Sequence, residues 1–294
     1  MFVHGFTDTG KEAWDKFPNL LYKDEELSPL DVCIWIYPSY GGLHDEVHLN
    51  VSESLMRYIL SFFIVGVLLC AQPAWSDVSY DTASSSTGVS CTSHSHTFAS
   101  HANLAIIIAS LRDGGGPPSS VSSITVAENN ATLIAGCAGS SGNARIEMWY
   151  HLKHPRGAQT VVVTVGGTID QMVTGVIFLI GAATSSTFGT CVTSLSSGTN
   201  VDVYSISSAL GELGVMGLAT NAAPTCAPDA TAVVSDERYD TANGANIKGC
   251  GYTEPGAAGT INIRADLGAS NSFAAAGVSV RALRRASGGV ILFQ

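Results

Sequence analysis

The sequence has few charged residues and especially few basic ones. Of its 294 residues, 14 are lysine or arginine and 24 are aspartate or glutamate, which gives a formal net charge of −10. Proteins that bind nucleic acid gather lysine and arginine into a basic patch or stripe, and no such patch is evident here. We therefore expect no nucleic-acid partner. The charged residues are also spread thinly along the chain, whereas an active site normally concentrates titratable groups.

The chain also lacks the motifs that would name a reaction. It contains no G-x-S-x-G nucleophile elbow. Serine is so frequent that the presence of serine, histidine and aspartate together carries no information about a catalytic triad. We expect a protein that is not an enzyme, has no catalytic residues and needs no cofactor.

One apolar run has the features of a secretory signal peptide. Segment 56–76 starts with a single positive charge at Arg57, continues with the apolar run 59–71, and ends with the small residues Ala74 and Ser76. The run is shorter than the roughly 20 residues of a membrane span. A buried core helix and a membrane anchor are the alternatives, but charge, length and exit residues agree with a signal peptide.

Cleavage after this segment would produce a mature chain that starts near Asp77 and is secreted, without a membrane segment. Residues 1–55 would then be an upstream extension that is absent from the mature protein. They hold 13 of the 38 charged residues. Within residues 1–45, FVHGFTDTGKEAW and DVCIWIYPSYGG resemble the early strands of an α/β-hydrolase, but His4 and Gly5 have no nucleophile elbow to serve.

Beyond residue 77 the hydrophobic pattern has the period of strands, without sustained helical spacing. Segment 171–182 is apolar on both faces, as in a central strand that is covered on both sides. Residues 77–285 are therefore predicted to form an all-β domain, a two-sheet antiparallel β-sandwich. The expected core residues are Ile106, Ile108, Ile146, Met148, Val162, Val176, Phe178 and Val280.

The order of several strand motifs resembles a widespread group of secreted, jelly-roll-like β-sandwich domains. The motifs are NLAIIIAS, SSVSSITV and ARIEMWYHLKHPRGAQTVVVTVGGTIDQMVTGVIFLIGA. The group carries an E-M-W-Y-type strand, a P-x-G-x-x-x-V-x-V hairpin and an apolar G-x-x-x-F-x-G strand. Some such domains are similar to subunits of extracellular fibrils that assemble by strand donation, so the resemblance implies a fold and a homopolymer rather than catalytic residues.

Cysteine usage agrees with export, because five cysteines follow residue 77 and two bridges would leave one over. Cys226 and Cys250 lie in loop-like stretches and are the favoured pair. Cys137 with Cys191 is the next choice, which leaves Cys91 free or paired with another subunit. Spacing does not determine connectivity, so other pairings stay open.

The histidines suggest only a weak metal site. His94 and His96 share one face of a strand, with His101 nearby, but a third or fourth ligand is not evident. Asp113 and the acidic residues within 236–240 match no calcium-loop spacing. A polar strand face and solvated loops are the preferred interpretations, and we expect no metal.

Features that could involve glycans are sparse. Trp149 is the only tryptophan after residue 77 and is expected in the core, while the tyrosines are scattered. A carbohydrate- or surface-binding module is therefore the second candidate function, on fold analogy alone. Asn130, in the sequon N-A-T, is the candidate glycosylation site of the mature chain.

Both ends of the mature chain suit strand addition. Segment 77–90 is polar, contains no proline, and has Val78 and Tyr80 alternating at its tip. Tail 286–294 contains an apolar run made of Val290, Ile291, Leu292 and Phe293. The first candidate function is therefore a structural subunit of an extracellular filament or surface assembly that polymerises head-to-tail, with segment 77–90 as the donor strand. The tail is the competing donor, and a monomer with both termini folded back is the competing outcome.

Overall fold

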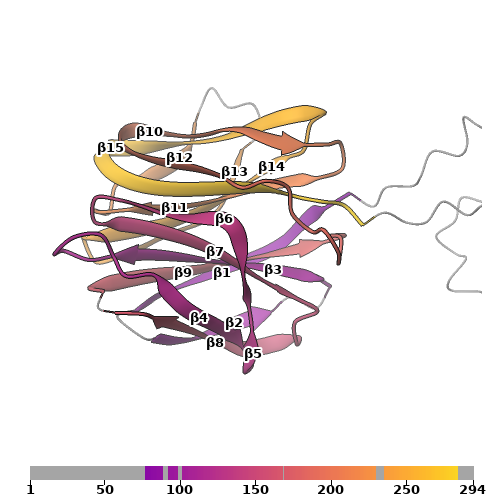
Figure 1. The fold of residues 1–294 in the computed structure, drawn as a ribbon, viewed down its shortest axis with the longest axis horizontal. Helices are drawn as coiled ribbons and strands as arrows, with labels where there is room; N and C mark the ends of the chain where they lie inside the picture. The colour runs from indigo at the N-terminus through magenta and orange to yellow at the C-terminus, as the bar shows by residue number, and fades with distance from the viewer. Residues whose placement is uncertain (1–76, 89–91, 99–100, 168, 230–234, 284–294) are drawn as a thin grey trace, which may run out of the picture. The chain divides into compact units, whose positions relative to one another are not determined.

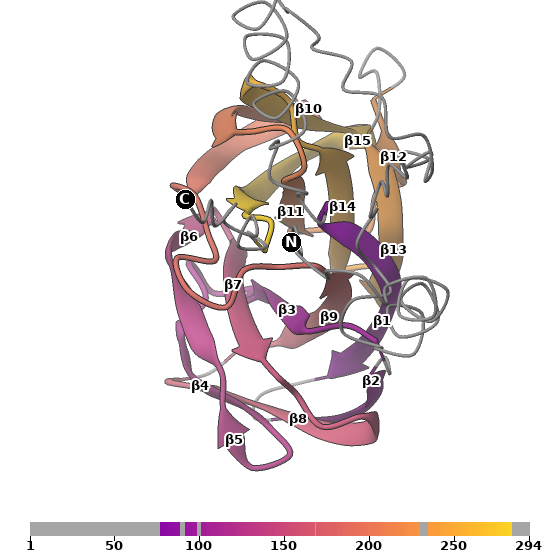
Figure 2. The same ribbon diagram turned by 90° about the vertical axis from the view of Figure 1, so that its right-hand side faces the viewer.

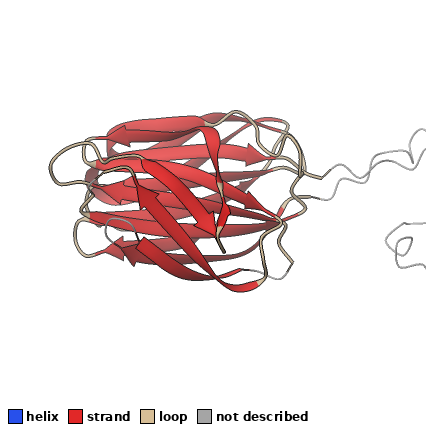
Figure 3. Cartoon of the chain, turned by 60° about the horizontal axis from the view of Figure 1, so that its bottom comes forward, coloured by secondary structure: helices blue, strands red, loops and turns tan. Residues whose placement is uncertain are grey.

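The computed structural model describes residues 77–88, 92–98, 101–167, 169–229 and 235–283. These residues form strands and loops without any helix, as Figure 3 shows. The all-β, antiparallel prediction is thereby confirmed. No helix in this part of the chain is long and apolar enough to cross a membrane. The strands are β1 (Ser79–Gly88), β2 (Thr92–Phe98), β3 (Leu104–Arg112), β4 (Val121–Val126), β5 (Asn129–Asn130), β6 (Thr132–Ser141), β7 (Ala144–Leu152), β8 (Gly157–Val165), β9 (Gln171–Ile180), β10 (Val192–Ser208), β11 (Leu213–Thr220), β12 (Cys226–Pro228), β13 (Asp236–Asn243), β14 (Ile247–Pro255) and β15 (Gly259–Val280).

The strands form three sheets, so the prediction of a two-sheet sandwich is wrong. The central sheet has the order β1-β9-β3-β7-β6, the long-strand sheet β10-β15-β11-β14-β13 with β12 beside β15, and the small sheet β2-β8-β4-β5. Figure 1 shows them as stacked layers with the central sheet in the middle. The reason is physical, since strands such as β3 and β9 are apolar on both faces and need a covering layer on each.

Alternate residues of the central strands enter two different cores. Ile106 and Ile108 of β3 pack toward the long-strand sheet, whereas Ile107 belongs to the core shared with the small sheet. In β7, Met148 and Trp149 divide in the same way. The two-residue period of a strand produces this division, because successive side chains point to opposite faces. Trp149 is a core residue, as expected.

The core prediction fails at one position, Val162, which is only partly buried. Its neighbours Val161 and Val163 are fully buried instead. The small sheet is covered on one side only, so just one face of β8 can enter the core. The other predicted core residues are fully buried: Ile106, Ile108, Ile146, Met148, Val176, Phe178 and Val280.

The two longest strands fold over the outer face of their own sheet. β10 pairs with β15 first over 192–198 and then, after a register shift, over 200–208. A third core forms where this second half meets β11 and β14, with Val203 and Ile263 clustering with Tyr252. The folded-over part of β10 and β15, residues 200–208 and 259–267, is called the outer ribbon below.

Two disulfides join parts of the chain that lie far apart in sequence. Cys137 is bonded to Cys191, and Cys226 to Cys250, the two pairs chosen from the sequence. They close loops of 54 and 24 residues, which the chain-entropy model equates with about 4 and about 3 kcal/mol of stabilisation. Such bonds are typical of an oxidising compartment. Cys91 lies outside the described residues.

Candidate assembly site

β1, the proposed donor strand, lies at the edge of the central sheet. It pairs antiparallel with β9 from Ser79 opposite Ile180 to Gly88 opposite Met172. β9 is its only ladder partner among the described strands. Figure 2 shows β1 on the side of the domain where β13 also lies. An edge strand has a row of backbone groups that no ladder partner satisfies.

The apolar tip of β1 is anchored on its own domain. Val78 is 5% exposed in the core between the central and long-strand sheets, and its N–H donates to the carbonyl of Gly211 at 2.8 Å. Tyr80 packs against the same core, and the guanidinium of Arg238 lies 3.9 Å from the centre of its ring. Within this single chain, the segment therefore occupies a strand position in its own sheet.

A register shift at Asp81 sets which side chains of β1 face the core. Tyr80 pairs with Leu179 and Thr82 with Phe178, so that Asp81 is skipped in the ladder. One extra residue reverses the alternation of side chains along a strand. Tyr80 and Ala83 can therefore both pack against the same core, although two residues lie between them and a regular strand would turn them to opposite faces.

Beyond the bulge, serine hydroxyls hold both faces of β1. Ser84 Oγ lies 2.8 Å from Nδ1 of His96, and Ser86 Oγ lies 3.2 Å from its Nε2. On the other face, Ser85 Oγ is 2.6 Å from the hydroxyl of Thr241 on β13. Hydrogen bonds rather than burial therefore fix this half of the strand, and each contributes only about 1 kcal/mol net.

The end of β1 is held by one further side chain. Nδ2 of Asn243, at the end of β13, donates to the carbonyl of Gly88 at 2.9 Å. No residue from Ser79 to Gly88 is fully buried, whereas eight of the nine residues of β3 are. Neither described disulfide involves β1. β1 is therefore the one strand of the central sheet without a buried residue, and no described disulfide holds it in place.

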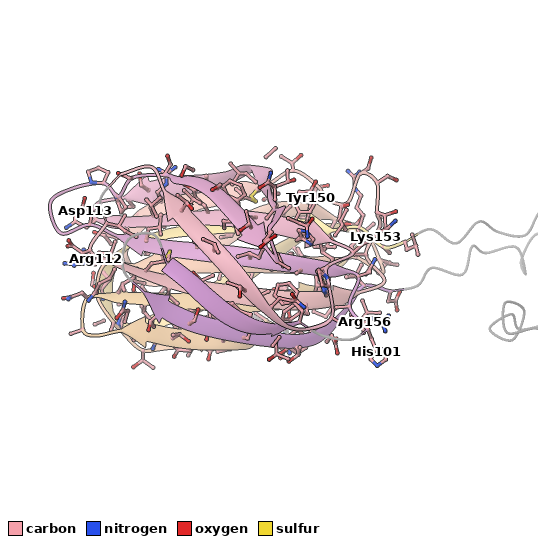
Figure 4. The ribbon with its side chains drawn as sticks, turned by 90° about the horizontal axis from the view of Figure 1, so that it is seen from below. His101, Arg112, Asp113, Tyr150, Lys153 and Arg156 are labelled. Atoms are coloured by element: carbon pink, nitrogen blue, oxygen red, sulfur yellow. A yellow bond between two sulfur atoms is a disulfide. The ribbon has the colours of Figure 1, made fainter. Side chains whose placement is uncertain are left out.

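The structure does not bring the candidate metal ligands named above together in one described site. His96 is 2% exposed, and both of its ring nitrogens lie within hydrogen-bond distance of serine hydroxyls. The side chain of His94 is outside the described part of the chain. Figure 4 shows His101 and Asp113 at opposite ends of the domain. Asp113 accepts a hydrogen bond from the N–H of Gly115 at 2.9 Å, which is a local turn contact.

The acidic residues of β13 are engaged in ion pairs. Asp236 lies 2.9 Å from Arg238, and Asp240 lies 2.7 Å from Lys248. Burial raises the pKa of Glu237, and the positive charge of Lys248 partly offsets this increase. Charges neutralised in this way do not converge on a calcium ion. Asn130, the glycosylation candidate, is exposed on β5.

The residues that hold β1 could not be predicted from the sequence. Arg238, Thr241 and Asn243 all come from β13, which follows β1 by about 150 residues. No local pattern links these segments. The competing donor, tail 286–294 with Val290 to Phe293, lies outside the described residues, as do the predicted upstream extension 1–55 and signal peptide 56–76.

Comparison of the chain with protein-family models, with curated proteins and with solved structures finds no match.

One buried histidine, His154, and one partly buried histidine, His151, lie at and just beyond the end of β7. His154 is 6% exposed and makes edge-on ring contacts with Phe98 at 4.9 Å and Phe178 at 5.6 Å. Burial lowers the pKa of His154, and burial together with the nearby His154 lowers the pKa of His151. Folding therefore favours the neutral, deprotonated form of both imidazoles.

Acid is expected to weaken the fold through these histidines. Because their folded-state pKa values are lowered, their contribution to stability is complete above the unfolded pKa of about 6.5 and is lost as pH falls below it. His154→Phe should flatten the loss of unfolding free energy between pH 7.5 and 5, measured by urea denaturation. His101→Gln, at an exposed site, is the matched control. An equal slope in His154→Phe and wild type would contradict this expectation.

Proposed function

We propose that the protein is a structural subunit of an extracellular filament, in which β1 of one copy takes the place of β1 in the next copy. The observation that carries this proposal is the position of β1. It is a polar strand at the edge of the central sheet, where it pairs with β9 along its length. None of its residues is buried, and no described disulfide involves it. Such a strand can leave its own domain at lower cost than any interior strand.

Exchange of β1 between copies preserves every contact described above. The backbone pairing with β9, the seat of Val78 and Tyr80, and the hydrogen bonds to His96 and Thr241 are the same in either arrangement. An identical element exchanged between copies is a low-cost route to association. Because donor and acceptor are different surfaces, the contact is heterologous, and it extends into a fibre unless the rotation closes a ring.

The bulge at Asp81 and the apolar tip supply the register of the exchanged strand. A slip by one residue would turn Tyr80 away from Arg238 and the core, and would turn Ser84 and Ser86 away from His96. The acceptor edge of β9 therefore favours one alignment of the donor. Backbone pairing provides affinity, and these alternate side chains provide specificity.

A disulfide that locks β1 to its own β9 tests the proposal. Ser86 and Thr174 are directly opposite in the ladder, so Ser86→Cys with Thr174→Cys should close a bond within one chain. We expect the oxidised variant to remain monomeric by light scattering and to form no filaments in micrographs, and the reduced variant to polymerise. Thr125→Cys with Val162→Cys, opposite positions of β4 and β8, is the control lock and should leave polymerisation intact.

Two results would contradict the proposal. Filaments of the oxidised lock would exclude β1 as the donor and would direct attention to tail 286–294, whose deletion is the second variant. A wild-type mature protein that stays monomeric at high concentration would exclude the filament itself.

A further inference from the structure

One aromatic ring stands out on the surface, and it lies on the outer ribbon rather than near β1. The side chain of Tyr204 is 48% exposed, the only exposed aromatic side chain among the described residues. Large aromatic side chains are normally buried, and a lone exposed ring with a hydroxyl offers both an apolar face and a polar end.

A strained bulge places this ring. The ladder between β10 and β15 shifts between Val203 and Ile206, so that Tyr204 and Ser205 together face Asn262. Ser205 has a φ of 58°, and its N–H donates to Oδ1 of Asn262 at 2.7 Å. A serine in this region costs on the order of 1–2 kcal/mol. Bulges re-aim side chains, and such strain is often found at functional sites.

A charged cluster from β10, β15 and the residue that follows β12 lies beside the ring. The guanidinium of Arg264 lies 5.3 Å from the centre of the Tyr204 ring, and it pairs with Asp202 at 3.2 Å and with Asp229 at 3.8 Å. A hydrogen bond to Asp202 is the main cause that raises the pKa of Tyr204. Burial and the carboxylates of Asp229 and Asp202 raise the pKa of Asp266.

We infer that this face of the outer ribbon binds a neutral saccharide. A pyranose ring can stack on Tyr204, its hydroxyls can donate to Asp202 and Asp229, and Arg264 can donate to its oxygens. The three carboxylates of this cluster, Asp202, Asp229 and Asp266, outnumber its one guanidinium and disfavour an acidic sugar. They also do not form a cation site, because Arg264 already lies between Asp202 and Asp229.

This site is separate from the strand exchange. The outer ribbon covers the outer face of the long-strand sheet, whereas β1 belongs to the central sheet, as Figure 1 shows. Saccharide binding therefore does not depend on polymerisation. A filament would repeat the site along its length, and repeated weak sites can act together on a polysaccharide.

Affinity electrophoresis of the full chain tests the inference. The neutral probes are hydroxyethylcellulose, xyloglucan and galactomannan, and the acidic probe is alginate. We expect retardation by at least one neutral polysaccharide and none by alginate. Tyr204→Ala should weaken the retardation at least about tenfold, Tyr204→Phe should keep most of it, and Leu210→Ala, at another exposed site, should leave it unchanged.

Three results would overturn the inference. The first is an absence of retardation by all three neutral polysaccharides. The second is equal retardation of wild type and a Tyr204→Ala protein with the same thermal midpoint. The third is retardation by alginate that matches retardation by the neutral probes. None of these outcomes depends on whether the oxidised β1 lock polymerises, so the two proposals can fail separately.

Discussion

Replacement of Glu147 by alanine is expected to lower the free energy of unfolding by about 3–5 kcal/mol. The carboxylate is 1% exposed and accepts three hydrogen bonds. They come from Nε of Arg145 at 2.7 Å, the N–H of Val121 at 3.0 Å and Nε1 of Trp149 at 3.2 Å. Alanine would leave all three donors without this acceptor, and the charge of Arg145 without its partner.

The effect should be large because Glu147 joins two layers. Its own strand, β7, lies in the central sheet, and Val121 begins β4 of the small sheet. Urea denaturation of Glu147→Ala measures the loss, with Asp236→Ala as the control. Asp236 also pairs with an arginine, but its side chain is 61% exposed, so its loss should cost less than about 1 kcal/mol. Equal losses in the two variants would show that burial is not the decisive factor.

Glu147 also shows which features of the fold can be predicted from the sequence. The alternation in ARIEMWYHL predicts Ile146 and Met148 on one face of a strand and Glu147 and Trp149 on the other, and the structure has this division. The alternation carries no information about which segment lies opposite. The contact with Val121 spans 26 residues, so the role of Glu147 could not be predicted.

The number of sheets was missed for a related reason. Segment 171–182 was expected to be covered on both faces, and β9 is. Two faces require two covering layers, but the strands of the small sheet are interspersed along the chain between those of the central sheet. Periodicity assigns strands and not sheets, so 92–98 and 157–165 could not be separated from the rest. The fold of the outer ribbon depends on a register shift, which has no signal in the pattern.

For the candidate site, the sequence predicted the strand but not the residues that contact it. An extended, proline-free segment with Val78 and Tyr80 at its tip was visible, and β1 is such a strand. Its neighbours Arg238 and Thr241 lie about 150 residues away, where only the folded chain brings them close. The pairing of Cys226 with Cys250 was predicted correctly, but the loop assignment behind it is wrong, since Cys226 lies in β12 and Cys250 in β14.

The second large effect is expected at Gly175 on β9, which pairs with Ser85 of β1. A Cβ added at Gly175 on β9, or at Gly251 on β14, would overlap the ring of Tyr239. Tyr239 comes from β13 and is 8% exposed, so its ring lies between two sheets with no free space on either side. Overpacking of this kind costs typically 1–3 kcal/mol and occasionally more, and Gly175→Ala should lie at the upper end.

A double-mutant cycle separates the overlap from any other effect of the alanine. Tyr239→Leu alone should destabilise the domain, because it removes buried apolar area. In the Gly175→Ala background the same change should restore stability by at least about 1 kcal/mol, since the shorter side chain makes room for the new methyl group. Additive losses would mean that Gly175 is needed for its backbone rather than for the ring. Because β9 carries the ladder that receives β1, Gly175→Ala should also weaken polymerisation, and Tyr239→Leu should restore both properties together.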